Sequence, residues 1–397
     1  MPVRGGSPRP AGDPRFFDGS YIPWLTVAAL TNIPESRMMV SETASCLTEE
    51  GALRSRTLLP GTLIIANSGA TLGVAKILGI KCCANDGIAA ILNLKKGVSA
   101  AYLAHYINTR TNYLRDVVAT GNGQPNLNTE LIGNFKIPLP PTLSEQEAIA
   151  EALSDADASI ESLEQLIAKK RQLKQGTMQE LLTGKRRLPG FSGDWETKRF
   201  DELFSVIRNA SNSRSELTEE GDVAYVHYGD IHTHQSAFLD VKSKQTYISR
   251  DHVLSVPRLA NGDLLMADAS EDTEAIGKAV EIVGLNGTEA VGGLHTMVLR
   301  PKGNALVDGF KGYIQFIPMV RSALVRLATG VSVYGVTKSG VRAIEVKIPD
   351  PDEQAAISTI LREMDEGIDC LEDKLAKARC LKHGMMQELL TGRVRLV

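Results

Sequence analysis

Several residue types and motifs are scarce in this sequence, and their scarcity limits what the protein can be. Five cysteines occur among 397 residues, an odd number without CxxC spacing, so neither a disulfide framework nor a zinc site is indicated. No apolar run approaches the roughly 18 residues of a membrane span, and the N-terminal residues contain no apolar signal core. We therefore expect a protein of the reducing cytoplasm.

Catalytic signatures are also missing. The sequence contains no GxxxxGK[ST] phosphate loop, no HExxH motif, no GxSxG elbow and no Asn/Asp-Pro-Pro-aromatic stretch of an amino-methyltransferase. The stretch at residues 121–126, GNGQPN, lacks the third glycine of a dinucleotide-binding loop. His232 and His234 would share one face of a strand, but no carboxylate or cysteine is arranged around them, so exposed polar histidines are favoured over a metal pair. We predict no catalytic residue, no metal and no cofactor in this chain.

Charge alone does not indicate a function. The formal net charge is −3. Residues 1–143 carry 13 basic and 9 acidic side chains, whereas residues 188–351 carry 17 basic and 21 acidic ones. A basic surface could form in the first segment, but the second would need local clustering of its cations to face phosphates.

One stretch dominates the sequence because it occurs twice. Residues 145–188 and residues 353–396 share 24 identities over 44 aligned positions, and both copies contain MQELLTG near their ends. An internal repeat of this kind indicates a duplicated architecture.

Each copy predicts a long helix with one apolar stripe. The apolar residues recur in alternating steps of four and three, which is the a/d pattern of a coiled coil. Such a helix is not stable alone, and the other copy is the nearest partner. We predict an antiparallel intramolecular coiled coil whose helix-helix seam consists of Ile149, Leu153, Ile160, Leu163, Ile167, Ile357, Leu361, Ile368, Leu371 and Leu375.

Prolines bound both helices, because proline is excluded from helix interiors. Ser144 and Asp352 are then the expected N-caps, and Gly184 and Gly392 are expected just beyond the C-terminal ends. The expected helical regions are residues 144–187 and 352–397. The prolines concerned are Pro138, Pro140, Pro141, Pro349 and Pro351.

The segments before the two helices repeat one plan. Both residues 1–143 and residues 188–351 alternate turns with short apolar runs, and Lys136-Ile137-Pro138 near the end of the first segment matches Lys347-Ile348-Pro349 in the second. The predicted fold class is α+β, a tandem duplication of an α+β domain plus a long helix. The helices stayed alike while the domains diverged, which fits a fixed frame that carries two different recognition domains.

Candidate DNA-binding residues are present in both domains. Arginine and lysine suit phosphates, and the amides of asparagine and glutamine suit adenine edges. Each candidate is by itself as compatible with a solvated loop residue. The candidates are Arg4, Arg9, Arg54, Arg56, Lys76, Asn122, Gln124, Asn126 and Asn128 in the first domain, and His232, His234, Lys278, Tyr334, Lys338 and Arg342 in the second.

Three stretches carry a family resemblance. The stretches GGSPRPAGDPRFFDGSYIPWLTVAAL, LLPGTLIIANSGATLGVAKILG and GNGQPNLNTELIGNFKIPLPPTLSEQEAIAEAL resemble a target-recognition domain followed by a central helical region of type I restriction-modification specificity subunits. The second half, with WETKRFDELF, IPDPDEQAAI and MQELLTGRVRL, is similar to a second such unit. The resemblance covers nearly the whole chain.

The resemblance implies a function and partners. A subunit of this family recognises a bipartite sequence in double-stranded DNA, with one domain for each half-site and the helices holding the spacing, and performs no chemistry. Two methyltransferase (M) subunits with S-adenosylmethionine, and two restriction (R) subunits with ATP and Mg, would act beside it. The competing interpretation is a coiled-coil protein-binding scaffold without DNA recognition, which the acidic balance of residues 188–351 favours.

The first domain departs from the family pattern at its start. The second domain opens with Trp195 to Phe204, a segment that the family has in both domains, whereas the first opens at Gly5-Gly6-Ser7. We expect that about 20 residues of the usual first domain are absent from this sequence.

Overall fold

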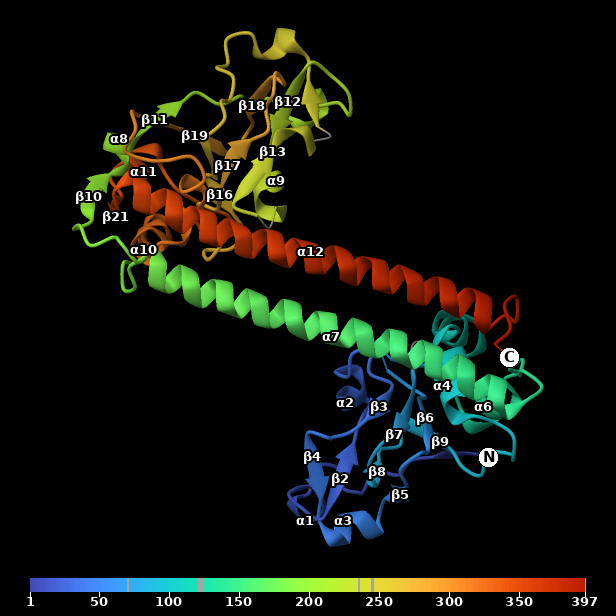
Figure 1. Cartoon of the computed structure of the whole chain (residues 1–397). Helices are drawn as coiled ribbons and strands as arrows, with labels where there is room; N and C mark the ends of the chain where they lie inside the picture. Colours follow the sequence, from blue (N-terminus) through green and yellow to red (C-terminus); the bar gives the residue numbers. More distant parts are fainter. Residues whose placement is uncertain (70, 120–124, 235, 244–245, 397) are drawn as a thin grey trace. The chain divides into compact units, whose positions relative to one another are not determined.

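A computed structural model describes residues 1–69, 71–119, 125–234, 236–243 and 246–396 (Figure 1). The chain divides into two compact units. Unit 1 comprises Met1–Ile167 and Leu371–Val397, and unit 2 comprises Ala168–Cys370. Each unit therefore holds one α+β domain and a part of each long helix, which are α7 (Leu143–Leu181) and α12 (Pro351–Leu389).

The domain of unit 1 contains two sheets. One has the strand order β1-β9-β6-β7-β3 and the other β4-β2-β8-β5. The elements in chain order are β1 (Pro2–Arg4), α1 (Pro14–Phe17), β2 (Ile22–Leu25), α2 (Val27–Thr31), β3 (Met39–Val40), β4 (Ser45–Leu47), α3 (Glu49–Leu53), β5 (Arg56–Leu58), β6 (Leu63–Ala66), β7 (Ala75–Leu78), β8 (Cys82–Ala84), β9 (Ile88–Ile91), α4 (Ala100–Asn108), α5 (Thr111–Tyr113), the π-helical turn η1 (Leu114–Val118) and α6 (Thr129–Asn134).

The domain of unit 2 repeats this plan with the orders β11-β19-β15-β17-β13 and β14-β12-β18. Two short pairs, β10-β21 and β16-β20, are added. The elements are β10 (Glu196–Arg199), α8 (Phe200–Leu203), β11 (Phe204–Ile207), η2 (Arg214–Glu216), β12 (Val223–Val226), α9 (Tyr228–Thr233), β13 (Phe238–Asp240), η3 (Val241–Ser243), β14 (Tyr247–Ile248), η4 (Arg250–Val253), β15 (Leu264–Ala267), β16 (Ala269–Ser270), β17 (Ala279–Val283), β18 (Ala290–Gly292), β19 (Thr296–Pro301), η5 (Lys311–Phe316), α10 (Pro318–Leu327), β20 (Tyr334–Gly335), α11 (Lys338–Arg342) and β21 (Glu345–Ile348).

The duplication extends to individual hydrogen bonds. In unit 1 the Asn108 amide accepts from Ala75 N at 2.7 Å and donates to Ala75 O at 3.0 Å. In unit 2 the Gln315 amide makes the same two bonds with Ala279. A helical side chain thus satisfies one strand residue in both domains, as buried backbone groups require. The predicted fold class, a tandem duplication of an α+β domain plus a long helix, is confirmed.

The central strands are buried on both faces, which explains their uniformly apolar sequences. All four residues of β6 (LIIA) and of β15 (LLMA) are buried. The pair β10-β21 has no counterpart in the described part of unit 1. In unit 2, α8 follows β10 and buries Phe200 and Leu203 in the core.

The expected N-caps of the long helices are wrong by two residues. Thr142 Oγ1 accepts from Glu145 N at 3.2 Å, and Asp350 Oδ1 accepts from the amides of Asp352 and Glu353, both at 3.0 Å. Ser144 therefore lies inside α7, and Asp352 lies inside α12. Pro351 is the first residue of α12, a position where its missing N–H costs nothing. Gly184 and Gly392 follow the helix ends with φ of +68° and +74°, as expected.

The helices pair antiparallel within each unit. In unit 1, Asp157 pairs with Lys382 and Glu164 pairs with Arg379, so the α12 residue number falls as the α7 number rises. In unit 2, Lys174 pairs with Asp365, and Arg187 beyond the end of α7 pairs with Glu353. The predicted antiparallel coiled coil is confirmed.

The predicted seam residues differ in how deeply they are buried. Ile149 and Leu153 pack with Leu389 and Leu390 in the core of unit 1, and Ile357 and Leu361 pack with Leu181 and Leu182 in the core of unit 2. These residues therefore join a domain to both helices. Ile160, Ile167 and Ile368 are also buried, whereas Leu163, Leu371 and Leu375 are only half-buried.

Candidate nucleic-acid interface

A short loop between α10 and α11 is the most exposed apolar feature of the described part of unit 2. Thr329 N donates to Gly335 O at 3.1 Å, and Gly335 N donates to Thr329 O at 2.8 Å, which closes the loop at its base. Gly330 has φ of +143°, and a Cβ there would lie 2.0 Å from Val333 O, so only glycine fits. β20 at the end of the loop pairs with β16. The loop is therefore fixed at both ends and at its turn.

Three of the predicted residues of the second domain gather beside this loop. Tyr334 is paired with Ser270 in β16, and His232 Nε2 lies 2.8 Å from Ala269 O in the same strand. Lys278 Nζ donates to His232 O at 2.8 Å, and burial lowers the pKa of Lys278. The polar groups of His232 and Lys278 therefore already have partners within the protein, and all three residues support the loop.

A second set of contacts holds Asp268, the residue between β15 and β16. Val336 N donates to Asp268 O at 3.0 Å, and His295 Nδ1 lies 3.4 Å from the Asp268 carboxylate. Burial raises the pKa of Asp268. The ring of Tyr228 packs edge-on against the rings of His232 and His295, with centroids 5.9 and 5.5 Å apart. Of this cluster only His232 is singled out from the sequence, because Asp268 and His295 lie far from it in the chain.

Cations flank the loop. Arg326 lies near the end of α10, and Lys338 and Arg342 lie on α11, and all three side chains are exposed. A Cβ on Gly340 would approach Leu327 to 2.9 Å, so the ends of the two helices pack closely. No ion pair holds these cations among the residues that the structure describes. They have the exposure that a phosphate contact requires.

His232 and His234 do not form the expected strand face. His232 lies in helix α9, and His234 is its C-cap, because His227 caps the helix at its N-terminus and accepts from Gly229 N at 3.2 Å. His234 Nε2 lies 2.6 Å from Phe238 O. No cluster of three metal-ligating side chains occurs among the described residues.

Three of the predicted arginines of the first domain lie together. Arg56 Nε donates to Arg4 O at 2.7 Å, Arg4 Nε donates to Asp86 O at 2.5 Å, and Arg9 lies 3.7 Å from the Asp86 carboxylate. Arg54 lies over the Phe16 ring at 4.7 Å and pairs with Glu50 at 3.3 Å. All four side chains are exposed, so this group remains a candidate phosphate-binding surface.

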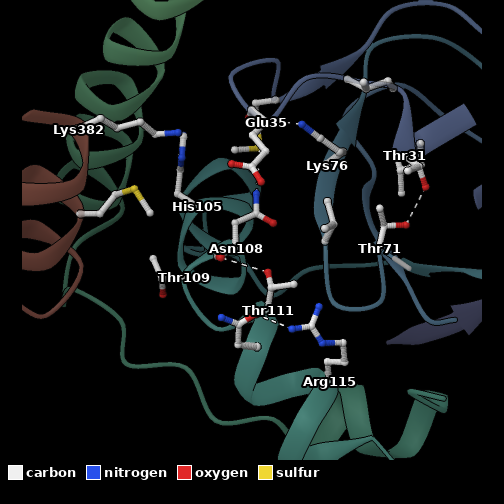
Figure 2. Close-up of a pocket in the computed structure, with 16 residues that line it drawn as sticks. Thr31, Glu35, Thr71, Lys76, His105, Asn108, Thr109, Thr111, Arg115 and Lys382 are labelled. Atoms are coloured by element: carbon white, nitrogen blue, oxygen red, sulfur yellow. Dashed lines mark hydrogen bonds between the residues drawn. The ribbon is translucent and has the colours of Figure 1, made fainter. Parts of the chain in front are cut away.

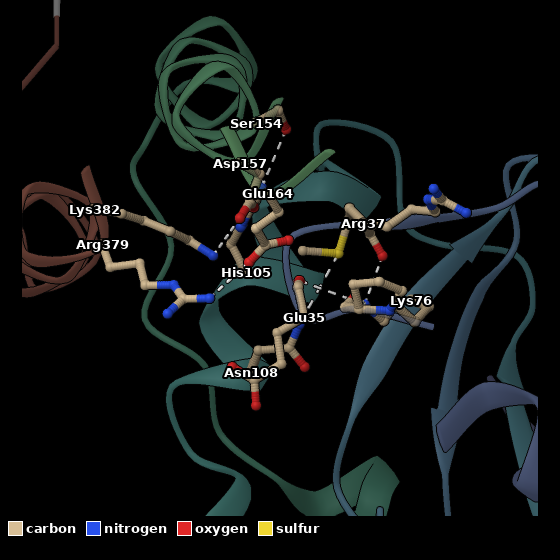
Figure 3. Close-up of polar contacts among 12 residues, drawn as sticks. Glu35, Arg37, Lys76, His105, Asn108, Ser154, Asp157, Glu164, Arg379 and Lys382 are labelled. Atoms are coloured by element: carbon tan, nitrogen blue, oxygen red, sulfur yellow. Dashed lines mark hydrogen bonds and ion pairs between the residues drawn. The ribbon is translucent and has the colours of Figure 1, made fainter. Parts of the chain in front are cut away.

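Lys76 is a wrong prediction. Its side chain is buried in β7, and Nζ donates to the carbonyl oxygens of Pro34 at 2.8 Å and Arg37 at 2.5 Å (Figure 3). Burial lowers the pKa of Lys76 to about 8. The side chain holds the segment before β3 in place and cannot contact a phosphate.

The amide-rich segment of the first domain is described only in part. Asn122 and Gln124 lie outside the described residues. Asn126 is half-buried, and Asn128 is the N-cap of α6, where its Oδ1 accepts from Leu131 N at 2.8 Å. Thr337 caps α11 in the same way through Gly340 N at 3.1 Å. Asn128 therefore has a structural role as a helix N-cap, and Thr337 has the same role in unit 2.

A polar cavity of about 460 Å³ lies in unit 1 (Figure 2). Lys382 and His105 approach it from one side, and Thr31 and Thr71 from the other. Its lysines and its arginine are engaged, since Lys382 pairs with Asp157 at 2.5 Å, Lys76 is held by carbonyls and Arg115 pairs with Asp116 at 3.1 Å. The cavity thus offers no free lysine or arginine among the described residues.

The polar cluster beside this cavity differs between the units. In unit 2 the Tyr313 hydroxyl donates to Asp365 Oδ2 at 2.8 Å. At the matching place in unit 1, His105 Nε2 lies 3.2 Å from Ser154 Oγ, and Asp157 Oδ2 has no hydrogen-bond partner among the described residues. Burial, together with Lys382 and Lys76, lowers the pKa of His105 to about 4. His105 is therefore neutral in the folded chain at neutral pH.

The stability of unit 1 should fall as the pH falls from about 6.5 to about 4. An unfolded histidine takes up a proton near pH 6.5, whereas His105 does so only near its folded pKa of about 4. The unfolded state binds more protons in this window, so about 1.4 kcal/mol of stability is lost for each pH unit. The variant His105→Tyr introduces the residue type that unit 2 has at the matching place, Tyr313, and the cavity that His105 lines leaves room for the larger ring. This variant should lack the loss of stability. Melting curves at pH 7 and pH 5 test the difference, and equal shifts for both proteins would contradict it.

The fold defines a protein of two α+β domains built on a pair of long helices. The chain belongs to the family of the type I restriction modification DNA specificity domain, whose model matches residues 7–171 and 192–378. It is 25% identical over 312 residues to the specificity subunit of the type I restriction enzyme MjaVIII of Methanocaldococcus jannaschii, an alignment that covers 74% of this chain and 70% of that protein.

Solved structures share the fold. The type I restriction-modification S subunit of M. genitalium matches with a TM-score of 0.62 at 13% identity and covers 98% of this chain and 93% of that one. A chain from work on complex assembly and conformational transition of the type I R-M system matches with a TM-score of 0.53 at 16% identity, covering 98% and 97% of the two chains. The protein is the non-catalytic DNA specificity component of a type I system, with two target-recognition domains. In the described residues no helix is long and apolar enough to cross a membrane.

Proposed function

We propose that this subunit binds a bipartite DNA target, with residues 1–143 recognising one half-site and residues 188–351 the other. The helical regions 144–187 and 352–397 hold the spacing between the half-sites. α7 and α12 have 39 residues each, which corresponds to about 58 Å at 1.5 Å per residue. The observation that carries the proposal is the presence of one α+β domain in each unit.

The proposal extends to partners. We infer that two M subunits bind the frame. One observation that supports this is a pair of equivalent exposed leucines, Leu173, which is 52% exposed in unit 2, and Leu381, which is 66% exposed in unit 1. Exposed leucines at matching positions suit two copies of one partner. S-adenosylmethionine belongs to these M subunits, and ATP and Mg belong to two R subunits where the system contains them. The complex acts on DNA in the cytoplasm.

The DNA contacts are assigned in the same way. Exposed cations bind phosphates and set the position of each domain: Arg4, Arg9, Arg54 and Arg56 in the first domain, and Lys338 and Arg342 in the second. Asn122, Gln124 and Asn126 are proposed to contact bases. His232, Lys278 and Tyr334 support the loop of residues 329–335. Sequence recognition in the second domain then falls to that loop.

Exchanging residues 188–351 for the corresponding domain of another specificity subunit should change one half-site only. The other half-site and the spacer should stay the same, because residues 1–187 and 352–397 are retained. Methylation sites mapped across a genome by the assembled complex give the result. An exchange that keeps residues 188–351 and replaces residues 1–143 is the matched control and should change the opposite half-site. A change in both half-sites from either exchange would refute the proposal.

A further inference from the structure

The loop between α10 and α11 exposes two valines. Val331 is 92% exposed and Val333 is 57% exposed, on a loop of seven residues from Thr329 to Gly335. Loop tips ordinarily carry polar residues, and an apolar side chain that is almost wholly in water gains free energy when a partner covers it. Packing of unit 2 does not explain why two valines stand here.

The valines are held in place before any partner binds. The two hydrogen bonds between Thr329 and Gly335 close the loop, and Gly330 admits no side chain because Val333 O occupies the space. The pairing of β20 with β16 continues this support below the tip. A valine side chain is also stiff at χ1, so little side-chain entropy is lost on contact. A fixed, stiff apolar tip suits recognition of a small apolar group.

The surroundings of the tip point to DNA as the partner. Arg326, Lys338 and Arg342 are exposed on the two helices that flank the loop, and within the described residues they form no ion pair. Such cations bind the phosphates on either side of a groove while the tip between them enters it. Glu271, Asp272 and Glu274 follow the supporting strand β16 and are exposed, which disfavours a phosphate directly at the tip. The tip is thus placed against base edges.

We propose that Val331 and Val333 recognise the C5-methyl groups of thymine in the major groove of the half-site read by the second domain. The thymine methyl is the apolar group that the major groove offers, and the minor groove has none. Minor-groove wedges use larger side chains such as phenylalanine or leucine, so a pair of valines fits the methyl contact better. This inference rests on the proposed function and names the bases that this domain requires.

Deoxyuridine substitution tests the contact. The subunit is assembled with its M partners, its target sequence is mapped, and each thymine of the second half-site, on either strand, is replaced singly by deoxyuridine, which lacks the methyl group. At one or two positions we expect affinity to fall about fourfold, the factor that corresponds to one buried methylene-sized group. The double variant Val331→Ser/Val333→Ser should bind thymine and deoxyuridine duplexes equally at those positions.

Matched variants and outcomes separate the possibilities. Val117 of unit 1 is 65% exposed, and Val117→Ser should keep the full discrimination. Retained discrimination in Val331→Ser/Val333→Ser, indifference of the wild-type complex to every substitution, or a half-site without thymine would each overturn the inference. A wild-type complex that binds no specific sequence would instead refute the proposed function itself.

Discussion

Replacing Leu361 with Asp should unfold unit 2, and replacing Leu153 with Asp should unfold unit 1. Both leucines are fully buried, and each packs against its own domain and the end of the other long helix. A carboxylate at either position is buried without a partner, which costs several kcal/mol. Because a domain has about 5–15 kcal/mol of total stability, this cost removes most of it.

Thermal melting followed by circular dichroism measures the effect. Leu173→Asp and Leu381→Asp make the same chemical change on the same two helices at positions that are 52% and 66% exposed. These controls should melt close to the wild type. Leu163 and Leu371, which the sequence pattern also places in the seam, are half-buried, so the same substitution there should cost less. Equal melting temperatures for Leu361→Asp and Leu381→Asp would show that the burial of Leu361 does not stabilise the paired helices.

Lys382→Met should destabilise unit 1 by about 3–5 kcal/mol, the usual cost of removing one partner of a buried ion pair. The Asp157 side chain is 3% exposed, and its Oδ2 already lacks a hydrogen-bond partner among the described residues. Burial raises the pKa of Asp157 even beside Lys382. Without Lys382 only the more distant Lys76 would offset this charge.

The duplication supplies a matched control. Lys174 pairs with Asp365 in unit 2, but the Asp365 side chain is 17% exposed and keeps the hydroxyl of Tyr313. Lys174→Met should therefore cost less than Lys382→Met. The double variant Lys382→Met/Asp157→Leu should recover most of the loss, since apolar replacements of a buried pair are often neutral. Chemical denaturation of the four proteins gives the comparison, and equal losses for the two lysine variants would contradict it.

The sequence predicts the architecture because repetition and periodicity survive divergence. The heptad steps of Ile149, Leu153 and their equivalents specify two helices and their pairing before any contact is known. The N-caps were missed although their signal is present. Thr142 and Asp350 each stand three residues before a glutamate, which is the spacing of a capping box.

The site was less predictable because the burial of a polar residue depends on tertiary packing. Lys76 lies in an otherwise apolar strand, and the acceptors that make its burial possible are carbonyls about 40 residues earlier in the chain. The pattern around His232 and His234 suits a strand, yet the cap made by His227 starts a helix there. The sequence does not distinguish Val331 and Val333 from other valines, because an exposed valine has no signature in a sequence.

Unit 1 contains both the first and the last segments of the chain, and this affects the order in which the units fold during translation. Arg395 pairs with Glu145 across a separation of 250 residues, and Leu389 and Leu390 complete the core around Ile149 and Leu153. Unit 2 is one continuous segment, and its corresponding bond from Arg187 to Glu353 spans 166 residues. Domains generally fold as they leave the ribosome. Unit 2 is fully translated at Cys370, whereas unit 1 still lacks its segment from Leu371 onwards at that point. The core of unit 1 is complete only when the last turns of α12 have been translated, and until then the start of α7 lacks Leu389 and Leu390.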